Sequence, residues 1–531
     1  MTSVLAPARS FRESAGTFLI VCALVFPLVL TLGMTKNFSH DEHQHVAAGA
    51  LVAREGLLPY RDFPHFHTPY LAYIYALLFR CTDHLLLAAR LFTVACAVAM
   101  VGVLGSVAYG LFRDKGRRLA ALVSTGTVLL FLTARVFGET TGRAWNHEPA
   151  LLFALLAFLA HAKGIRGQKS GWLIGSGLLL GIAIGLRITF APLVAPFALA
   201  LALYLPPPRW RPLLLTSFAA GLLLGGFGIL GLFIAAPEQA WFGNYEFAKV
   251  NVLYRFESGN PRTMTVLKKL RYFKNQFLRR ELLLVIVCVL PMIAMRLTRT
   301  LRHGARFEHG FVLITLPFLL IGCFAPSPLF QQYFYPLVPF LLLAALYGLA
   351  SVAPETVWFR RTLVLGALCV VLSVGLGRRI YDHIGLLASA RSWTPVKFHR
   401  FGVELRPLAA SGRVLTLAPI YPLEAGLPIY PALATGPFAW RISPYVEPGK
   451  AARLGMITPA TLEATLDADP PGAFLLGFEH GRGAEKDLQR YAGSRGYVPI
   501  HRPDGHQLWM KETVTRPAGM PAAEAGGGRI E

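Results

Sequence analysis

The chain has 531 residues, of which 54% are hydrophobic and only 15% are charged. Apolar runs of about 17 to 25 residues recur along it, which is the length that crosses a hydrocarbon core of roughly 30 Å. All six cysteines lie in or beside these runs, which argues against a disulfide scaffold and a CxxC metal site. The net charge of +23 sits mostly in loops and suits binding to anionic lipid head groups. The sequence shows no soluble basic domain with interleaved aromatic residues, so it does not indicate a nucleic-acid partner.

The sequence predicts a polytopic α-helical membrane protein with about eleven transmembrane helices. We place the spans near residues 17–34, 85–112, 118–134, 148–162, 171–186, 188–205, 212–235, 282–295, 309–325, 329–351 and 361–377. Residues 170–205 would make a helix far longer than the bilayer at about 1.5 Å rise per residue. We therefore expect a tight hairpin there, with Arg187 at its tip. An odd number of spans puts the two termini on opposite sides of the membrane.

Basic residues in the short loops indicate the orientation. One set of short loops carries 17 Lys and Arg, and the facing set carries seven. The N-terminus is therefore predicted to be cytoplasmic and the C-terminal region periplasmic, in a bacterial inner membrane. The longer outer loop 236–281 opposes this bias with nine more basic residues, Lys268 and Lys269 among them. We interpret that excess as a feature that contacts an anionic acceptor or the phosphate of a donor.

The first outer loop, 35–84, begins with a concentration of titratable side chains, "NFSHDEHQH" (37–45). A short helix ending at Gly56 follows, and then "HFHTPYLAYIYALLFRC" (65–81), which is too short to span and rich in tyrosine. Aromatic residues of this kind favour the membrane interface. The loop is therefore predicted to form two helices along the bilayer that hold Asp41 and Glu42 over its edge.

The composition changes after residue 377. Four stretches are predicted to be strands, and "EKDLQRYAGSRGY" (485–497) is predicted to be a helix between them. The strand candidates are 413–419, 472–478, 497–502 and 506–511. The predicted domains are therefore a transmembrane domain over 1–377, a small extracytoplasmic α/β domain over 378–513, and a disordered tail rich in Ala, Gly and Pro over 514–531.

Several motifs, taken as an ordered set, resemble the GT-C glycosyltransferases. The resemblance is to the branch that contains protein O-mannosyltransferases and lipid A aminoarabinose transferases (glycosyltransferase family 39-like). It rests on the acidic pair after the first span and on "LPYRDFPHFHTPYLAYIYALLF" (58–79), "NHEPALLFALLAFLA" (146–160), "GLRITFAPLVAPF" (185–197) and "QQYFYPLVPFLLLAAL" (331–346). The resemblance implies a GT-C fold and transfer of a sugar from a polyprenyl phosphate to an acceptor hydroxyl on the outer face, usually with inversion of the anomeric centre.

The resemblance implies three catalytic carboxylates. Polyprenyl phosphate is a good leaving group, so the reaction mainly needs a base for the acceptor proton and cations for the phosphate. Asp41 matches the family's first-loop aspartate and is expected to act as the base, with Glu42 beside it. Asp41 could equally cap the helix that follows it. Glu148 lies where the family usually shows aspartate, although an acid before Pro149 also suits the start of a helix.

Arg187 is the cation that we expect to bind the donor phosphate, because a guanidinium holds phosphate through two bonds. An interfacial arginine that extends to the membrane surface is the alternative. Tyr333 is expected to contact the same phosphate, although an aromatic belt explains it equally well. Many family members carry a lysine before the proline of the second surface helix, where this chain has Thr68. His65, His67 and the basic loop around Lys268 and Lys269 are candidates to replace it.

The remaining candidate substrate-binding residues are His65, His67, Asn146 and His147. Histidines close to acidic residues are good ligands for a divalent ion. Their spacing in the first outer loop matches no zinc signature, and this branch generally needs no metal. We therefore expect neither a metal nor another cofactor.

The sequence thus predicts a transferase that uses a polyprenyl-phosphate-linked sugar donor, within membrane lipids, and a lipid, glycan or protein acceptor. The acceptor classes that remain open are lipid A, another glycolipid, a polysaccharide and a protein. The rival hypothesis is a lipid or solute transporter or flippase. Transporters often show internal duplication and charged residues near the midplane, whereas here no repeat is visible and the carboxylates lie at the outer ends of spans. A non-catalytic lipid-binding or assembly subunit is the third hypothesis.

Overall fold

The computed structural model describes residues 5–205, 211–259, 265–300, 305–407, 412–479, 484–501 and 505–511. The predicted tail 514–531 lies outside the described residues. The chain divides into two compact units. Unit 1 comprises Met1–Lys36, Arg90–Gly231 and Gly259–Trp393, and unit 2 comprises Asn37–Ala89, Leu232–Ser258 and Thr394–Glu531. The first outer loop therefore groups with the C-terminal region rather than with the apolar helices.

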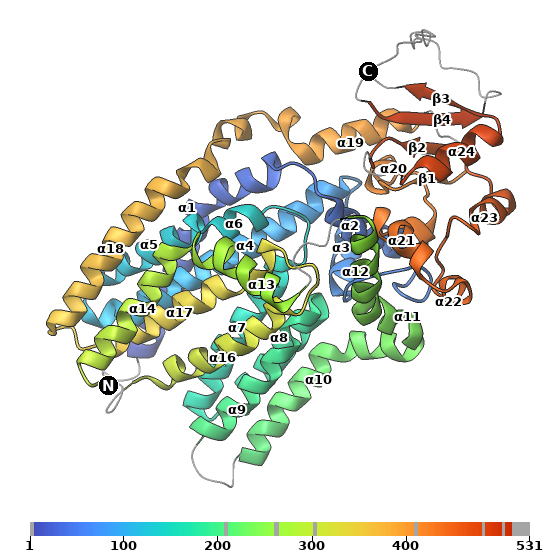
Figure 1. The fold of residues 1–531 in the computed structure, drawn as a ribbon. Coiled ribbons are helices and arrows are strands. Elements are labelled where there is room, and N and C mark those ends of the chain that lie inside the picture. Colours follow the sequence, from blue (N-terminus) through green and yellow to red (C-terminus); the bar gives the residue numbers. More distant parts are fainter. Residues whose placement is uncertain are drawn as a thin grey trace. The chain divides into compact units, whose positions relative to one another are not determined.

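Each of the eleven predicted spans corresponds to a helix in the described part of the chain (Figure 1). These helices are α1 (Leu5–Thr35), α4 (Leu85–Phe112), α5 (Arg117–Thr133), α7 (His147–Gly167), α8 (Ser170–Leu186), α9 (Val194–Tyr204), α10 (Arg211–Ala235), α14 (Leu282–Leu297), α16 (Phe307–Phe324), α17 (Leu337–Ser351) and α18 (Val357–Gly377). Among the described residues, seven helical segments are long and apolar enough to cross a membrane, and α8, α9 and α14 are shorter apolar helices. The chain is thus a multi-pass membrane protein.

The predicted hairpin at Arg187 is present. α8 ends at Leu186, Arg187 is extended, and the 3-10 helix η2 (Ile188–Leu193) leads into α9. His161 shows that the chain reverses here, because its Nδ1 lies 3.1 Å from Ser176 Oγ of α8 and its Nε2 lies 3.0 Å from Phe197 O of α9. Two helices in line would hold those two residues about 30 Å apart at 1.5 Å rise per residue.

α8 and α10 cross at unusually close range because glycines face each other. Gly177 and Gly181 on α8 pack against the segment of α10 that holds Gly221 and Gly225. A Cβ atom on Gly225 would lie 2.2 Å from the carbonyl oxygen of Leu178. Small residues four apart are the usual means by which membrane helices bring their backbones together.

Along the chain, short helices connect the long helices of unit 1. They include α6 (Arg135–Thr140), α13 (Val266–Phe273), the π-helical turn η4 (Lys274–Leu278) and the 3-10 turn η5 (Gln331–Phe334). The π-helical turn places Phe273 and Phe277 against Phe334 of η5, with ring centroids 4.9 and 5.7 Å apart. This aromatic packing fixes α13 to the start of α17.

Unit 2 contains the first outer loop together with a small α/β region, whereas the sequence prediction assigned that loop to the transmembrane domain. Its helices are α2 (His40–Glu55), α3 (Tyr70–Phe79), α11 (Pro237–Trp241), α12 (Phe247–Glu257), α19 (Thr394–Leu405), α20 (Ile420–Glu424), α21 (Pro437–Ile442), α22 (Pro448–Arg453), α23 (Leu462–Ala468) and α24 (Lys486–Ser494). Its strands are β1 (Val414–Thr416), β2 (Ala473–Leu476), β3 (Tyr497–His501) and β4 (Gln507–Lys511). All four strand predictions and the helix prediction near 485–497 are confirmed.

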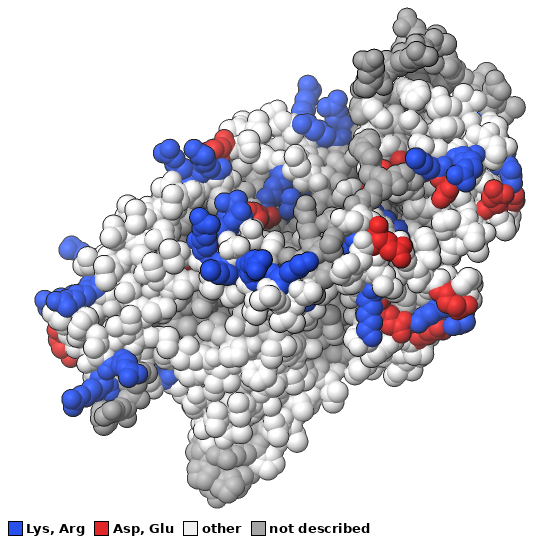
Figure 2. All heavy atoms as spheres, in the orientation of Figure 1, with Lys and Arg blue, Asp and Glu red and all other residues white. Residues whose placement is uncertain are grey.

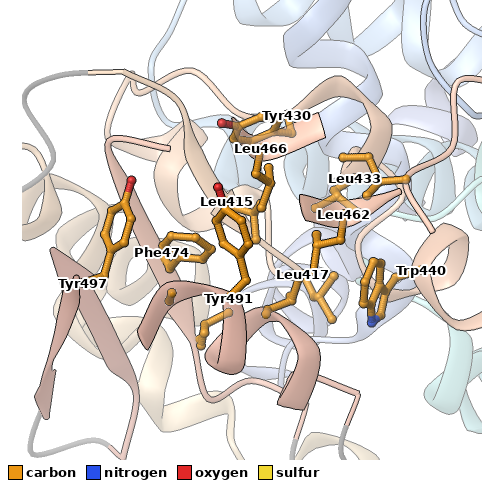
Figure 3. Close-up of a cluster of buried hydrophobic side chains, with 14 residues drawn as sticks. Leu415, Leu417, Tyr430, Leu433, Trp440, Leu462, Leu466, Phe474, Tyr491 and Tyr497 are labelled. Carbon is orange, nitrogen blue, oxygen red and sulfur yellow. The ribbon is translucent and has the colours of Figure 1, made fainter. Parts of the chain in front are cut away.

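The four strands form one sheet in the order β1-β2-β4-β3, with β1 parallel to β2 and the other pairs antiparallel. Side chains alternate between its faces, as expected for strands. On one face Phe474 and Leu476 pack with α23 and α24 in a buried cluster (Figure 3). On the other face Ala473 and Leu475 pack with Leu405 of α19. Tyr430 and Trp440 also belong to the first cluster, so these rings serve the core.

Candidate functional site

Arg187 stands at the centre of the polar cluster in unit 1. Its Nη1 donates to Asn146 Oδ1 at 2.9 Å, and its Nε donates to Thr189 Oγ1 at 3.0 Å. The nitrogen of the same side-chain amide, Nδ2, donates to the carbonyl oxygen of Leu186 at 2.9 Å. Asn146 therefore gives a hydrogen-bond donor to a carbonyl at the C-terminal end of α8 and orients the guanidinium of the next residue, Arg187. The side chain is held firmly, and only 8% of the residue is exposed.

Two aromatic rings complete the surroundings of Arg187. Nη1 also lies 3.1 Å from His147 Nε2, which must accept the bond because a guanidinium has no lone pair to offer. The guanidinium carbon lies 5.1 Å from the ring centroid of Tyr333, and the rings of Tyr333 and His147 stack with centroids 6.2 Å apart. The structure thus brings together four predicted site residues, Arg187, Asn146, His147 and Tyr333, from three separate motifs.

Glu148 lies in the first turn of α7 and is fully buried. The charges of Lys36 and Arg143 act on its carboxylate, as does the hydroxyl of Thr141. Thr141 Oγ1 in turn lies 3.2 Å from the hydroxyl of Tyr335. A buried carboxylate is stable only among groups that compensate its charge. Lys36 and Arg143 supply part of that compensation, and burial remains the largest effect on the carboxylate.

Sequence reasoning missed Lys36. Its Nζ donates to the carbonyl oxygen of Thr141, which places the amine beside the cluster of Glu148. Burial and, to a smaller extent, the charge of Arg143 lower the pKa of Lys36 to about 7, against the opposing effect of Glu148. Its position directly after the first span was the only signal in the sequence. Arg143, three residues before Asn146, was also missed. Neither residue belongs to a motif.

The two predicted lysines of the 236–281 loop differ in environment. Lys269 is buried, and its Nζ donates to the carbonyl oxygen of Phe324, at the end of α16, at 2.7 Å. It therefore stabilises a helix end in this structure. Lys268 and Arg271 are exposed on α13, and Lys274 is exposed at the start of η4. Figure 2 shows Lys and Arg gathered over α13.

Asp41 and Glu42 lie in unit 2, in the first turn of α2. Glu42 is fully buried, and its Oε2 accepts a bond from the backbone N–H of Ser39 at 2.9 Å. Glu42 therefore completes a capping box with Ser39, the N-cap residue of α2. Asp41 is half-buried beside it.

His65 and His67 also lie in unit 2, next to His45 of α2. The rings of His45 and His67 lie 4.7 Å apart, and those of His65 and His67 lie 6.5 Å apart. Burial lowers the pKa of His65 to about 4, so its ring is neutral near pH 7. His65 thus carries no positive charge that could replace the family's lysine at Thr68. Within the described ranges, no group of three or more His, Cys, Asp or Glu side chains could hold a metal ion.

Three comparisons relate this chain to known proteins. Residues 66–241 match the profile of a family described as dolichyl-phosphate-mannose-protein mannosyltransferase. The whole fold is similar to that of ArnT from Cupriavidus metallidurans bound to undecaprenyl phosphate, with 13% identity, a TM-score of 0.57, and coverage of 93% of this chain and 97% of that chain. The apo state of ArnT gives a TM-score of 0.56 at 13% identity, with 93% and 96% covered. No curated protein gives a significant match. The chain therefore has the GT-C fold.

Proposed function

We propose that this protein is a membrane glycosyltransferase that transfers a sugar from a polyprenyl-phosphate donor to an acceptor hydroxyl on the periplasmic face of a bacterial inner membrane. The observation that carries the proposal is the cluster around Arg187. Its Nη1 donates to Asn146 and its Nε donates to Thr189, and the ring of Tyr333 lies 5.1 Å from the guanidinium carbon, so the guanidinium is held in one orientation. A guanidinium that is fixed in this way can bind a phosphate through two hydrogen bonds.

The fold supports the choice of donor. ArnT shares this fold over nearly the whole length of both chains, and one of its structures holds undecaprenyl phosphate. Arg187 and Tyr333 are proposed to hold the donor phosphate, with Asn146 and His147 orienting the guanidinium. Lys268 is proposed to attract the phosphate from the exposed face of α13.

The proposed reaction is a single displacement. Asp41 takes the proton of the acceptor hydroxyl, whose oxygen attacks the anomeric carbon of the sugar. The bond from that carbon to the phosphate oxygen breaks, and polyprenyl phosphate leaves with the electron pair. One displacement inverts the anomeric centre. Glu148 lies in the first turn of α7, where the charges of Lys36 and Arg143 act on it. It is proposed as a second carboxylate that orients the sugar.

The test is mass spectrometry of envelope glycolipids, polysaccharides and proteins from cells with the wild-type gene, a deletion and Asp41→Asn. The transferase predicts that one sugar-modified species is absent from both mutants, which also identifies the acceptor. Binding of polyprenyl phosphate by the purified Asp41→Asn protein should remain. A deletion phenotype that Asp41→Asn fully restores would contradict the proposal and would favour a transporter or an assembly subunit.

A further inference from the structure

A second charged cluster lies at the start of α2, and the mechanism above does not use it. Glu479, three residues beyond the end of β2, carries a carboxylate whose side chain is 4% exposed. Its Oε1 lies 3.0 Å from Nδ1 of His40, the first residue of α2. Its Oε2 pairs with the guanidinium of Arg441 on α21. All three residues belong to unit 2.

The carboxylate of Glu479 is ionised at neutral pH. Burial by itself raises its pKa, but the hydrogen bond from His40 and the charge of Arg441 outweigh that effect, and the pKa lies below its ordinary value. A buried charge that two partners hold is rigidly placed, because moving either partner away removes one of the two interactions that compensate the cost of its burial. Glu479 therefore ties the sheet region to the first residue of α2.

The rest of the same helix end is held by the same region. Phe38, two residues before His40, packs on Phe398 of α19 with ring centroids 4.5 Å apart. His43 packs against Phe38 at 4.6 Å, and its Nδ1 accepts a bond from the backbone N–H of Ile420 at 3.5 Å. The first turn of α2, which carries Asp41, is thus fixed on both sides of that residue by the C-terminal part of the chain.

We propose that Glu479 is a positioning residue for Asp41. By holding His40 and Arg441 it sets the direction of the first turn of α2, so that the small α/β region is part of the catalytic apparatus rather than an accessory. This inference rests on the proposed function, since it assumes that Asp41 is the base. It assigns no contact between Glu479 and a substrate.

The variant Glu479→Gln tests the inference in the purified full-length protein. We expect kcat for sugar transfer to fall about tenfold or more, because small displacements of a catalytic group have effects up to about 100-fold. The KM for the polyprenyl-phosphate donor should stay unchanged. The matched control is Glu238→Gln, which breaks an exposed ion pair between α11 and Arg453 in the same unit, 2.9 Å long. The control should retain wild-type kcat.

His40→Ala separates positioning from folding, because it removes only the link to α2 and leaves Glu479 paired with Arg441. It should lower kcat about as much as Glu479→Gln does while the thermal midpoint stays close to that of the wild type. Each of these variants combined with Asp41→Asn should have the same kcat as Asp41→Asn alone. A misplaced base and an absent base both impair removal of the acceptor proton, so their effects do not add.

The outcomes distinguish the two proposals. If Asp41→Asn abolishes transfer while Glu479→Gln and His40→Ala keep wild-type kcat, the positioning role is wrong and the proposed function stands. If the double variants lose activity additively, Glu479 acts independently of Asp41 and the inference is likewise wrong. If Asp41→Asn itself transfers sugar at the wild-type rate, Asp41 is not the base, and the positioning role of Glu479 fails with it while the transferase function stands.

Discussion

Arg187 and Asn146 are joined by a hydrogen bond of 2.9 Å from Nη1 to Oδ1, and the same asparagine closes the end of α8 through Leu186. One amide thus links the end of one membrane helix to the beginning of another, α7, and fixes a cation between them. Because the guanidinium is locked before any ligand arrives, little side-chain entropy remains to be lost on binding an anion. This arrangement makes the identity of residue 187 more important than its charge alone.

Arg187→Lys should therefore lower transfer activity strongly although it keeps the charge. A lysine ammonium cannot reproduce the two hydrogen bonds that the planar guanidinium donates to Asn146 and Thr189. It also lacks the paired N–H donors that bind a phosphate through two bonds. We expect kcat/KM to fall about 100-fold or more, in line with the loss of one preorganised donor. Arg135→Lys, at an exposed ion pair with Glu139 in the same unit, is the control and should be neutral. Equal activity of both variants would remove Arg187 from the donor site.

Because of Lys36, the free energy of unfolding should increase as the pH rises above neutrality. Burial lowers its pKa in the folded chain to about 7, whereas an unfolded lysine has a pKa near 10.5. Between these values the unfolded state binds more protons, so stability rises with pH by up to about 1.4 kcal/mol per unit. Lys36→Met should flatten the rise of the thermal midpoint between pH 7 and 9, and the exposed Lys274→Met should not. An unchanged rise in Lys36→Met would contradict the assignment.

Gly225→Ala should destabilise the helix crossing of α8 and α10. The added Cβ would lie 2.2 Å from a backbone oxygen, which the rigid helix α8 cannot move easily. Overpacking of this kind typically costs about 1–3 kcal/mol. The next residue provides the control, since a Cβ on Gly226 would meet no atom within 4 Å. Thermal unfolding in detergent should show a lower midpoint for Gly225→Ala and an equal or higher midpoint for Gly226→Ala, because alanine favours helix.

His65 should make unit 2 sensitive to mild acid. Burial lowers its pKa to about 4, below the ordinary value of 6.5, so between these values the unfolded state binds more protons. The stability that His65 contributes is therefore complete above pH 6.5 and is lost as the pH falls toward 4. His65→Gln should reduce the fall of the thermal midpoint between pH 7 and 5, and the exposed His501→Gln should not. Buried His43, whose pKa burial also lowers, accounts for part of the remaining slope.

The sequence alone determined the elements of this protein. Apolar length located the eleven helices that correspond to the predicted spans, seven of which are long and apolar enough to cross a membrane, and the excess length of residues 170–205 predicted the reversal at Arg187. Alternating apolar residues located the four strands. Each of these features depends on neighbours in the chain, because helix and strand periodicity and the thickness of a bilayer act over a few to about twenty residues. Motifs likewise identified Arg187, Asn146, His147 and Tyr333 as candidates, one motif at a time.

Only the tertiary structure decided which of these side chains meet. It placed Tyr333 under Arg187, buried Lys269 against the end of α16, joined Glu42 to Ser39 in the capping box of α2, and brought Lys36 to Glu148 and Glu479 to His40. Lys36 and Glu479 belong to no motif, and the only sign of Lys36 in the sequence was its position directly after the first span. The reason is physical: an ion pair depends on distance and burial in space, and residues far apart in the chain acquire both only when the fold has formed.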